Sequence, residues 1–416
     1  MAYITRIQID QCRNVRQLDI DLSVPADENG ANGSAAPARP KFRHLILTGP
    51  NGSGKSGVLE ELAAHVDAAL YPDPARPMLP VVITSWIPEP ELWKDSHGRG
   101  LGLGALTAWR EIGSMLASAG AQGEMIAAYL PARRRMQPQK VAGPSKLDWG
   151  PKSLTTSTEA AAKLLQFLVN KRMEQALAAE DQDSAAVERT RDWFSAFEGH
   201  LRRLTEDEGL SLDFDRRAFN FRFRRGDGYT FDINTLADGH AAVLAILAEL
   251  LIRVDVIREA RKDYAFVPEG VVIVDEIETH LHLSLQEKIL PFLTELFPTL
   301  QFIVATHSPA VIASIPNAVV VDLLTREPVL SDHFRGIRYG MLMTEHFGIS
   351  SEIDLDSTRK LLRLRDLAGR ATRAANEEKE LSDLSALLTS RSPSMAVEVW
   401  MVKERLGYAS PAEAKK

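Results

Sequence analysis

One short motif near the N-terminus constrains the fold of this chain more than any other feature. Residues 49–56 read Gly-Pro-Asn-Gly-Ser-Gly-Lys-Ser, which is the pattern G-x-x-x-x-G-K-[ST]. An apolar run at 45–48 precedes it, and an amphipathic helical pattern at 58–64 follows it. This strand–loop–helix context is typical of a loop that surrounds a polyphosphate with backbone N–H groups at a helix N-terminus. The alternative, a glycine-rich turn that contains Lys-Ser by chance, is disfavoured by these flanking patterns.

The motif predicts a role for its own residues in binding a nucleoside triphosphate. Lys55 would reach the β- and γ-phosphates, and the Ser56 hydroxyl would ligate Mg²⁺. The predicted nucleotide-binding residues are Gly49, Pro50, Asn51, Gly52, Ser53, Gly54, Lys55, Ser56 and Gly57.

Composition narrows the class of protein around this motif. The 416 residues suffice for two or three domains, and the formal charge of −7 disfavours a general nucleic-acid coat. Cys12 is the single cysteine, which excludes an internal disulfide and a cysteine-rich zinc site. No apolar run approaches the roughly 18 residues of a membrane span, and the N-terminus has no signal-peptide core. We therefore expect a cytoplasmic protein without a membrane partner.

Apolar periodicity predicts how the rest of the chain is organised. Alternating patterns at 2–10 and 16–23 predict an N-terminal β lobe, and residues 157–206 predict a pair of helices. Phenylalanines at alternate positions in 219–223, a glycine turn and the run 229–233 predict a hairpin. Buried strands and helices alternate after residue 238, which predicts a largely parallel sheet.

A second cluster of polar residues follows a buried strand far along the chain. The apolar run 271–274 ends in Asp275 and Glu276. Carboxylates at this end of a parallel strand lie where ligands bind, so Asp275 is placed to hold the Mg²⁺ shell and Glu276 to polarise the attacking water. The alternative is a strand end that carries two solvated acids.

A histidine follows the next predicted strand. The apolar strand 301–305 is followed by Thr306-His307-Ser308-Pro309. At this place, His307 could hydrogen-bond a phosphate oxygen or the attacking water. From the residues alone, a purely structural histidine is an equally good interpretation.

Together these segments resemble the ATPases of the ATP-binding-cassette and structural-maintenance-of-chromosomes superfamily. The closest likeness is to the AAA-like group that includes the overcoming-lysogenisation-defect nucleases, and it rests on residues 275–282 and 297–309 beside the phosphate loop. The likeness covers residues 1–23, 42–70 and 234–325, but not the middle or the tail. It implies an α/β P-loop NTPase fold of ABC/SMC-like type with a mixed sheet, an antiparallel N-terminal β lobe, a helical insertion and a C-terminal helical appendage. The predicted domains are 1–150 and 209–335 for the two halves of the ATPase domain, 151–208 for the insertion and 336–416 for the appendage.

The resemblance also implies a signature loop that contacts the nucleotide of a second subunit. Leu236, Asp238, Gly239 and His240 stand in its place, although Asp238 and His240 depart from the usual residues. The alternative is a helix N-cap made by Asp238. If the loop is a signature, the unit is a head-to-tail dimer with two composite sites.

Two further nucleotide contacts follow from the same resemblance. Gln137 is the candidate for the glutamine loop and for a Mg²⁺ contact, with Gln139 as the alternative. Arg13 stands where the family has an adenine-side arginine, although a solvated hairpin arginine fits the sequence equally well. No Asn-Lys-x-Asp guanine reader is present, so ATP is favoured over GTP. The expected cofactors are ATP and Mg²⁺.

The resemblance suggests the ATPase of a bacterial anti-phage defence system. Such a protein works as a homo-oligomer, controls a separate effector protein and responds to DNA or a phage-derived trigger. Two basic clusters, around Arg133-Arg134-Arg135 and on the hairpin around Arg222 and Arg224, leave open a DNA-repair ATPase that binds DNA ends. For the hairpin arginines, the alternative is a solvated strand face paired with nearby acids. The arginine triplet could also serve the nucleotide or the subunit interface. A slowly hydrolysing, nucleotide-dependent scaffold is the third possibility.

Overall fold

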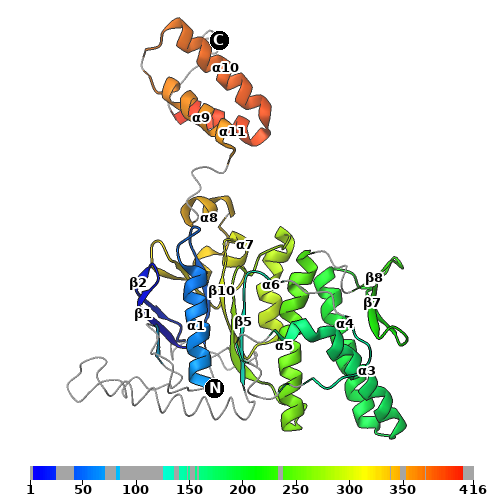
Figure 1. The fold of residues 1–416 in the computed structure, drawn as a ribbon. Coiled ribbons are helices and arrows are strands. Elements are labelled where there is room, and N and C mark those ends of the chain that lie inside the picture. The colour runs from blue at the N-terminus through cyan, green and yellow to red at the C-terminus, as the bar shows by residue number, and fades with distance from the viewer. Residues whose placement is uncertain are drawn as a thin grey trace, which may run out of the picture. The chain divides into compact units, whose positions relative to one another are not determined.

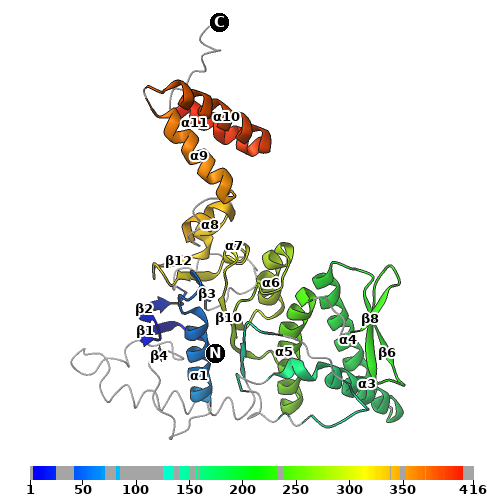
Figure 2. The same cartoon turned by 45° about the horizontal axis from the view of Figure 1, so that its top comes forward.

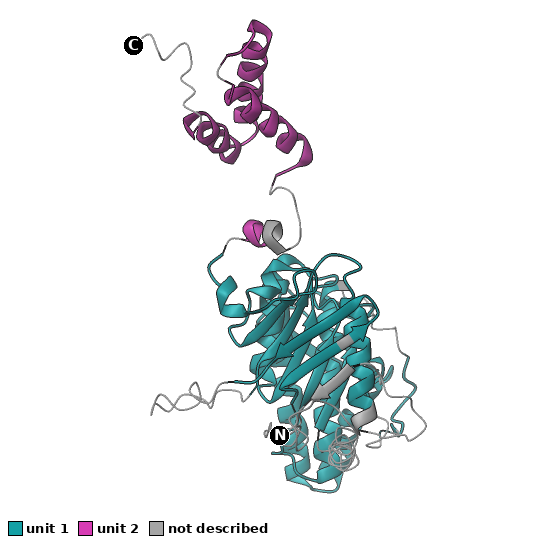
Figure 3. Ribbon diagram, turned by 90° about the vertical axis from the view of Figure 1, so that its left-hand side faces the viewer, with its two compact units in different colours: residues 1–337 teal, residues 338–416 magenta. Residues whose placement is uncertain are grey.

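The structure is a computed structural model of the whole chain. It describes residues 3–24, 42–70, 81–84, 125–134, 140–147, 149, 155–156, 159–232, 238–337, 339–346, 353–370 and 372–405. The chain divides into two compact units, which are Met1–Ile337 and Arg338–Lys416 (Figure 3).

A central sheet with one antiparallel edge forms the middle of the first unit (Figure 1). Its strand order is β12-β11-β3-β10-β9-β5, and all neighbouring pairs are parallel except β12 with β11. The strands are β3 (His44–Thr48), β5 (Met125–Leu130), β9 (Glu269–Val274), β10 (Leu300–Ala305), β11 (Ala318–Asp322) and β12 (Pro328–Leu330). The nearly continuous apolar composition of β3, β9, β10 and β11 matches strands that are buried on both faces.

An antiparallel sheet forms the N-terminal lobe. Its order is β2-β1-β4, with β1 at Arg6–Cys12, β2 at Val15–Asp21 and β4 at Val81–Thr84. Ile7 and Ile9 of β1, and Leu18 and Ile20 of β2, are buried at alternate positions, so these stretches turn their apolar side to the core. Buried Gln301 joins this lobe to the central sheet, because its side chain accepts from Ile4 N at 2.7 Å and donates to Ile4 O at 2.8 Å.

Helix α1 (Lys55–Leu70) lies between the lobe and one face of the central sheet. Alternate residues of the central strands join Val58, Leu59 and Leu62 of the helix in one buried cluster. The remaining alternate residues, such as Val272 and Phe302, are buried on the opposite face. Helices α5 (Asp238–Arg261) and α6 (Leu283–Leu296) lie on that side in Figures 1 and 2.

The region between the two halves of the central sheet is a helical pair followed by a small sheet. Helix α3 (Leu164–Glu180), preceded by a 3₁₀ turn at Ala160–Lys163, packs against α4 (Ser184–Thr205). The sheet has the order β6-β7-β8, with strands Ser211–Asp215, Asn220–Arg224 and Thr230–Asp232. The predicted hairpin is present as β7 and β8, whereas β6 had no separate prediction.

Short elements complete the first unit, and helices form the second. The first unit also contains α7 (Pro309–Ile312) and a 3₁₀ turn at Ser331–Phe334. The second contains α8 (Tyr339–His346), α9 (Leu355–Ala368), α10 (Ala375–Arg391) and α11 (Pro393–Arg405). Leu364, Leu388, Met395 and Val399 form a buried cluster among α9, α10 and α11. None of the helices that the structure describes combines the length and apolar character needed to cross a bilayer.

Candidate active site

The phosphate-binding motif forms the turn between β3 and α1. Gly49, Gly52 and Gly54 adopt φ values of 129°, 79° and 105°, a region that favours glycine. A Cβ on Gly54 would lie 2.6 Å from Asn14 Oδ1, so the close approach of the β1–β2 turn also requires glycine there. Asn14 Nδ2 donates to Gly52 O at 2.6 Å, a contact that the sequence did not predict.

The side chain of Lys55 folds back over this loop. It is 6% exposed, and its Nζ donates to Gly49 O at 2.9 Å and to Pro50 O at 3.1 Å. Burial lowers the pKa of Lys55, while the negative field of Asp275 and Glu276 raises it. The cation therefore faces the acids that follow β9.

Arg13 lies in the β1–β2 turn next to α1. Its backbone is left-handed, with φ of 54°, and its guanidinium pairs with Glu60 of α1. A Cβ on Gly57 would lie 2.8 Å from Arg13 Cδ, so the arginine packs against the first turn of the helix. Its position beside the phosphate loop is compatible with a nucleotide contact, which stays a prediction.

Asp275 stands directly after β9, at the carboxyl end of that strand. The side chain of Ser56 hydrogen-bonds Asp275, which links the end of the phosphate loop to the end of β9. Burial raises the pKa of Asp275, while the bond from Ser56 lowers it. Asp275 Oδ1 is buried without a hydrogen-bond partner among the described residues. A buried carboxylate oxygen of this kind fits the ligand shell of Mg²⁺, so Ser56 and Asp275 fit the ion that the motif implies.

Glu276 occupies a strained turn. Its φ is 44°, and His280, four positions later, also has a left-handed φ of 66°. Such conformations cost roughly 1–3 kcal/mol each for non-glycine residues and concentrate at functional sites. The Thr279 hydroxyl donates to Glu276 Oε2 at 3.0 Å and so orients the carboxylate.

Arg134 holds the backbone of this turn. Its Nη1 donates to Asp275 O at 2.5 Å and to Pro131 O at 2.9 Å, and its Nη2 donates to Glu276 O at 2.9 Å. The side chain is 8% exposed, and burial lowers its pKa. The sequence grouped Arg134 in a basic cluster that could bind DNA or serve the nucleotide or the subunit interface. In the structure, Arg134 points inward and binds the turn after β9. The only feature of the sequence that pointed to a place for Arg134 in the site was its position after the buried strand β5.

His307 lies at the end of β10, between the two other strand ends. Register pairs Ala305 with Leu47 of β3, and Val304 with Val274 of β9, so the three ends are level. Burial lowers the pKa of His307; Lys55 lowers it further, whereas Glu278, Glu276 and Asp275 raise it. The histidine is therefore within the electrostatic reach of the phosphate loop and of the acids.

The signature-like segment begins α5, which starts at Asp238. A Cβ on Gly239 would lie 2.7 Å from His280 O, so glycine is required where this helix meets the turn after Glu276. Burial lowers the pKa of His240. Leu236 and Gln137 lie outside the described residues. The role of this segment towards a second subunit stays a prediction.

The arginines of the small sheet pair with acids nearby. Arg222 lies 3.7 Å from Asp215, and Arg224 pairs with Asp213. Arg225 lies 3.4 Å from Asp207. The paired, solvated strand face weighed in the sequence is therefore what these three residues form.

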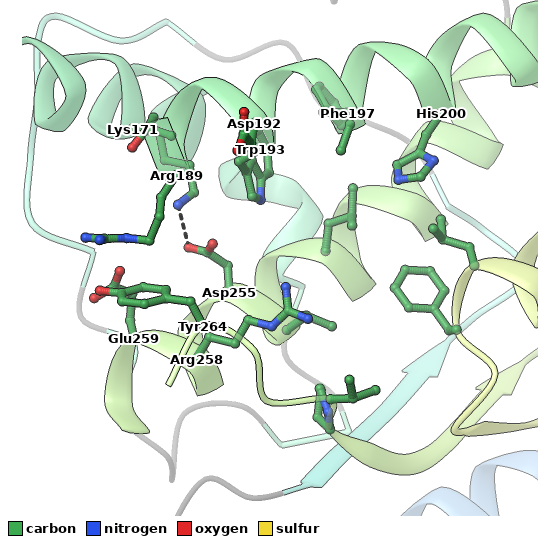
Figure 4. Close-up of a pocket in the computed structure, with 18 of the residues that line it drawn as sticks. Lys171, Arg189, Asp192, Trp193, Phe197, His200, Asp255, Arg258, Glu259 and Tyr264 are labelled. Atoms are coloured by element: carbon green, nitrogen blue, oxygen red, sulfur yellow. Dashed lines mark ion pairs between the residues drawn. The ribbon is translucent and has the colours of Figure 1, made fainter. Parts of the chain in front are cut away.

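A cavity of about 440 Å³ lies at the opposite end of the central sheet (Figure 4). It is bordered by α3, α4 and the C-terminal half of α5, and by Pro268 and Leu300 before and at the start of two central strands. On its wall, Lys171 Nζ lies 2.8 Å from Asp255 Oδ2, and both side chains are nearly buried. Burial raises the pKa of Asp255, while Lys171 lowers it.

Aromatic rings border the charges of this cavity. Lys171 Nζ lies 5.2 Å from the ring centroid of Phe167 and 5.3 Å from that of Trp193. The Arg189 guanidinium lies 4.3 Å from the centroid of the Tyr264 ring. These are the distances of cation–π contacts, which stabilise the charges within the wall.

The fold and the strand-end residues are those of an α/β P-loop NTPase. A phosphate-binding loop follows β3, two acids follow β9, and the strand that ends in the switch-like histidine lies between them. The predicted fold class is confirmed. Residues 159–313 match the family described as "AAA domain, putative AbiEii toxin, Type IV TA system". The matched range includes α3 and α4, which the likeness seen in the sequence did not cover.

Individual relatives agree with this class over short stretches. The chain is 38% identical over 82 residues to the retron Ec83 probable ATPase of Escherichia coli, which is 20% of this chain and 15% of that protein. It is 30% identical over 95 residues to the Septu protein PtuA of Bacillus mycoides (strain KBAB4), which is 23% of this chain and 13% of that protein. The chain thus spans less than a fifth of these curated relatives. A crystal structure of an Smc head bound to the C-winged helix domain of ScpA aligns with 79% of this chain and 97% of that chain, at 14% identity and a TM-score of 0.41.

Proposed function

We propose that this protein binds ATP with Mg²⁺ and hydrolyses it. The observation that carries the proposal is the convergence of Lys55, Asp275 and His307 at the ends of three adjacent parallel strands. Ligands of open parallel sheets bind outside the carboxyl ends of the strands, where these residues lie.

Each side chain at the strand ends has a separate role in the proposed hydrolysis. Lys55 Nζ would exchange the carbonyls of the loop for phosphate oxygens, and Ser56 with Asp275 would hold Mg²⁺. The Glu276 carboxylate, oriented by Thr279, accepts the proton of the attacking water. His307 donates a hydrogen bond towards the γ-phosphate or the water. Bound ATP supplies the phosphoanhydride bond that is cleaved.

The active unit in this proposal is a head-to-tail homodimer. Support comes from Gly239 in the first turn of α5, which lies against the turn after Glu276. In an ATP-bound dimer, this segment would meet the phosphate loop of the second copy.

The biological role that we propose is the regulatory ATPase of an anti-phage defence system, acting on a separate effector in response to DNA or another phage-derived trigger. Support comes from the stretches shared with a retron probable ATPase and with a Septu protein. A DNA-repair role has less support, since Arg222, Arg224 and Arg225 of the small sheet already pair with acids. The scaffold alternative predicts that function survives the loss of hydrolysis.

Light scattering of the Glu276→Gln variant tests the dimer. This variant should retain ATP and accumulate as a dimer with Mg-ATP, but stay monomeric with ADP. A Glu276→Gln protein that binds ATP and has the same mass with both nucleotides would contradict the composite site.

A further inference from the structure

Glu278 joins two segments of the candidate active site. It lies two residues after Glu276, and its carboxylate accepts from two successive groups on another strand end. Thr306 Oγ1 donates to Glu278 Oε2 at 2.8 Å, and His307 N donates to Glu278 Oε1 at 2.5 Å. One carboxylate thus fixes both the position and the direction of the chain at His307.

Backbone hydrogen bonds also join this end of β10 to β3 and to the turn after β9. Thr306 N donates to Leu47 O at 3.0 Å, and Ile277 N donates to Ala305 O at 3.2 Å. These backbone bonds align the strand ends, but neither involves the amide of His307. The amide of His307 instead donates to the Glu278 carboxylate.

The turn that carries Glu278 needs such side-chain anchors. Glu276 and His280 have left-handed backbones on either side of it. Arg134 holds the carbonyls before it, and Glu278 holds the strand end beside it. Hydrogen bonds to a charged acceptor are stronger than those to a neutral one, so these anchors oppose the strain of the turn.

We propose that Glu278 is a positioning residue, which acts on hydrolysis by holding His307 in register with Glu276. The proposal rests on the proposed ATPase function. It predicts that the effect of Glu278 on turnover passes through the His307 side chain. A carboxylate that merely stabilised the fold would affect turnover independently of His307.

A double-mutant cycle tests this dependence. Glu278→Ala should lower kcat about tenfold to hundredfold, because a displacement of about 1 Å costs that much, while the affinity for ATP changes less than about threefold. In the His307→Ala background, Glu278→Ala should lower kcat less than about threefold further. Glu278→Gln keeps one acceptor and should recover part of the rate. Independent, additive losses would overturn the proposal, as would an unchanged kcat.

Amide hydrogen exchange provides a second readout without turnover. Glu278→Ala should speed exchange at residues 306–308 and leave α9 to α11 unchanged, whereas Glu287→Ala on the exposed side of α6 should alter neither. Unchanged exchange at 306–308 would overturn the proposal. Faster exchange in a protein whose wild type does not hydrolyse ATP would instead leave Glu278 as the anchor of His307 and refute the proposed ATPase function.

Discussion

The two ends of the central sheet differ in whether their buried charged groups have partners. At the carboxyl end, the buried Asp275 Oδ1 has no hydrogen-bond partner among the described residues, and Glu276 has a strained backbone. At the amino end, Lys171 pairs with Asp255 and lies against two aromatic rings. Both ends carry charged side chains. Unpaired polar atoms and strain indicate binding and chemistry, whereas paired charge indicates structure.

Turnover should separate the two ends most strongly. Glu276→Gln removes the proton acceptor and should lower single-turnover hydrolysis by about 10²- to 10⁴-fold, while ATP still binds. Glu287→Gln, an exposed change on α6, is the matched control and should retain the wild-type rate. If Glu276→Gln hydrolysed ATP normally, the proposal that the carboxyl end of the sheet is the catalytic end would be contradicted.

Stability should respond in the reverse order. Lys171→Met leaves Asp255 buried without its cation and should cost about 3–5 kcal/mol in the free energy of unfolding by urea at neutral pH. Since burial already raises the pKa of Asp255, protonation relieves the unpaired charge, and the loss should shrink as pH falls.

The double variant Lys171→Met/Asp255→Leu is the control for that prediction. It removes both charges and should recover most of the lost stability. Hydrolysis should stay near the wild-type rate in the double variant. A double variant that unfolds as easily as Lys171→Met would show that the pair has a role beyond mutual compensation.

His44, the first residue of β3, should have a smaller, pH-dependent effect on the free energy of unfolding. Its Nδ1 accepts from Phe302 N at 3.0 Å, and burial lowers its pKa to about 4. The unfolded chain binds the proton near pH 6.5, so the contribution of His44 is complete above that pH and decreases as pH falls towards 4. This histidine should account for about 2 kcal/mol of the stability lost between pH 7 and 4.5. His44→Asn should flatten the dependence in that window, and an unchanged slope would contradict the assignment.

The sequence predicted which residues lie at the ends of the central strands better than it predicted the hydrogen bonds between those ends. The sequence predicted the phosphate loop, Asp275 and His307 as site residues because each follows a buried strand. Parallel strands present their carboxyl ends at one edge of the sheet. Arg134, Thr279 and Glu278 were not predicted as contacts of the site. Their partners are backbone groups or side chains whose positions depend on the register of β5, β9 and β10 and on a left-handed turn.

The small sheet and the cavity show the same limit. Alternation predicted β7 and β8, but β6 pairs with β7 through residues whose apolar signal is short. The Lys171–Asp255 pair joins α3 to α5 across a long stretch of chain, and helical periodicity alone gives no sign of it.

The central claim is that nucleotide binds at the carboxyl end of the sheet and depends on Lys55. Titration calorimetry with Mg-ATP tests it most directly in the wild type, Lys55→Ala and the double variant Lys171→Met/Asp255→Leu. The account predicts that Lys55→Ala loses binding, while the double variant binds as the wild type does. Full binding by Lys55→Ala, or loss of binding only in the double variant, would contradict it.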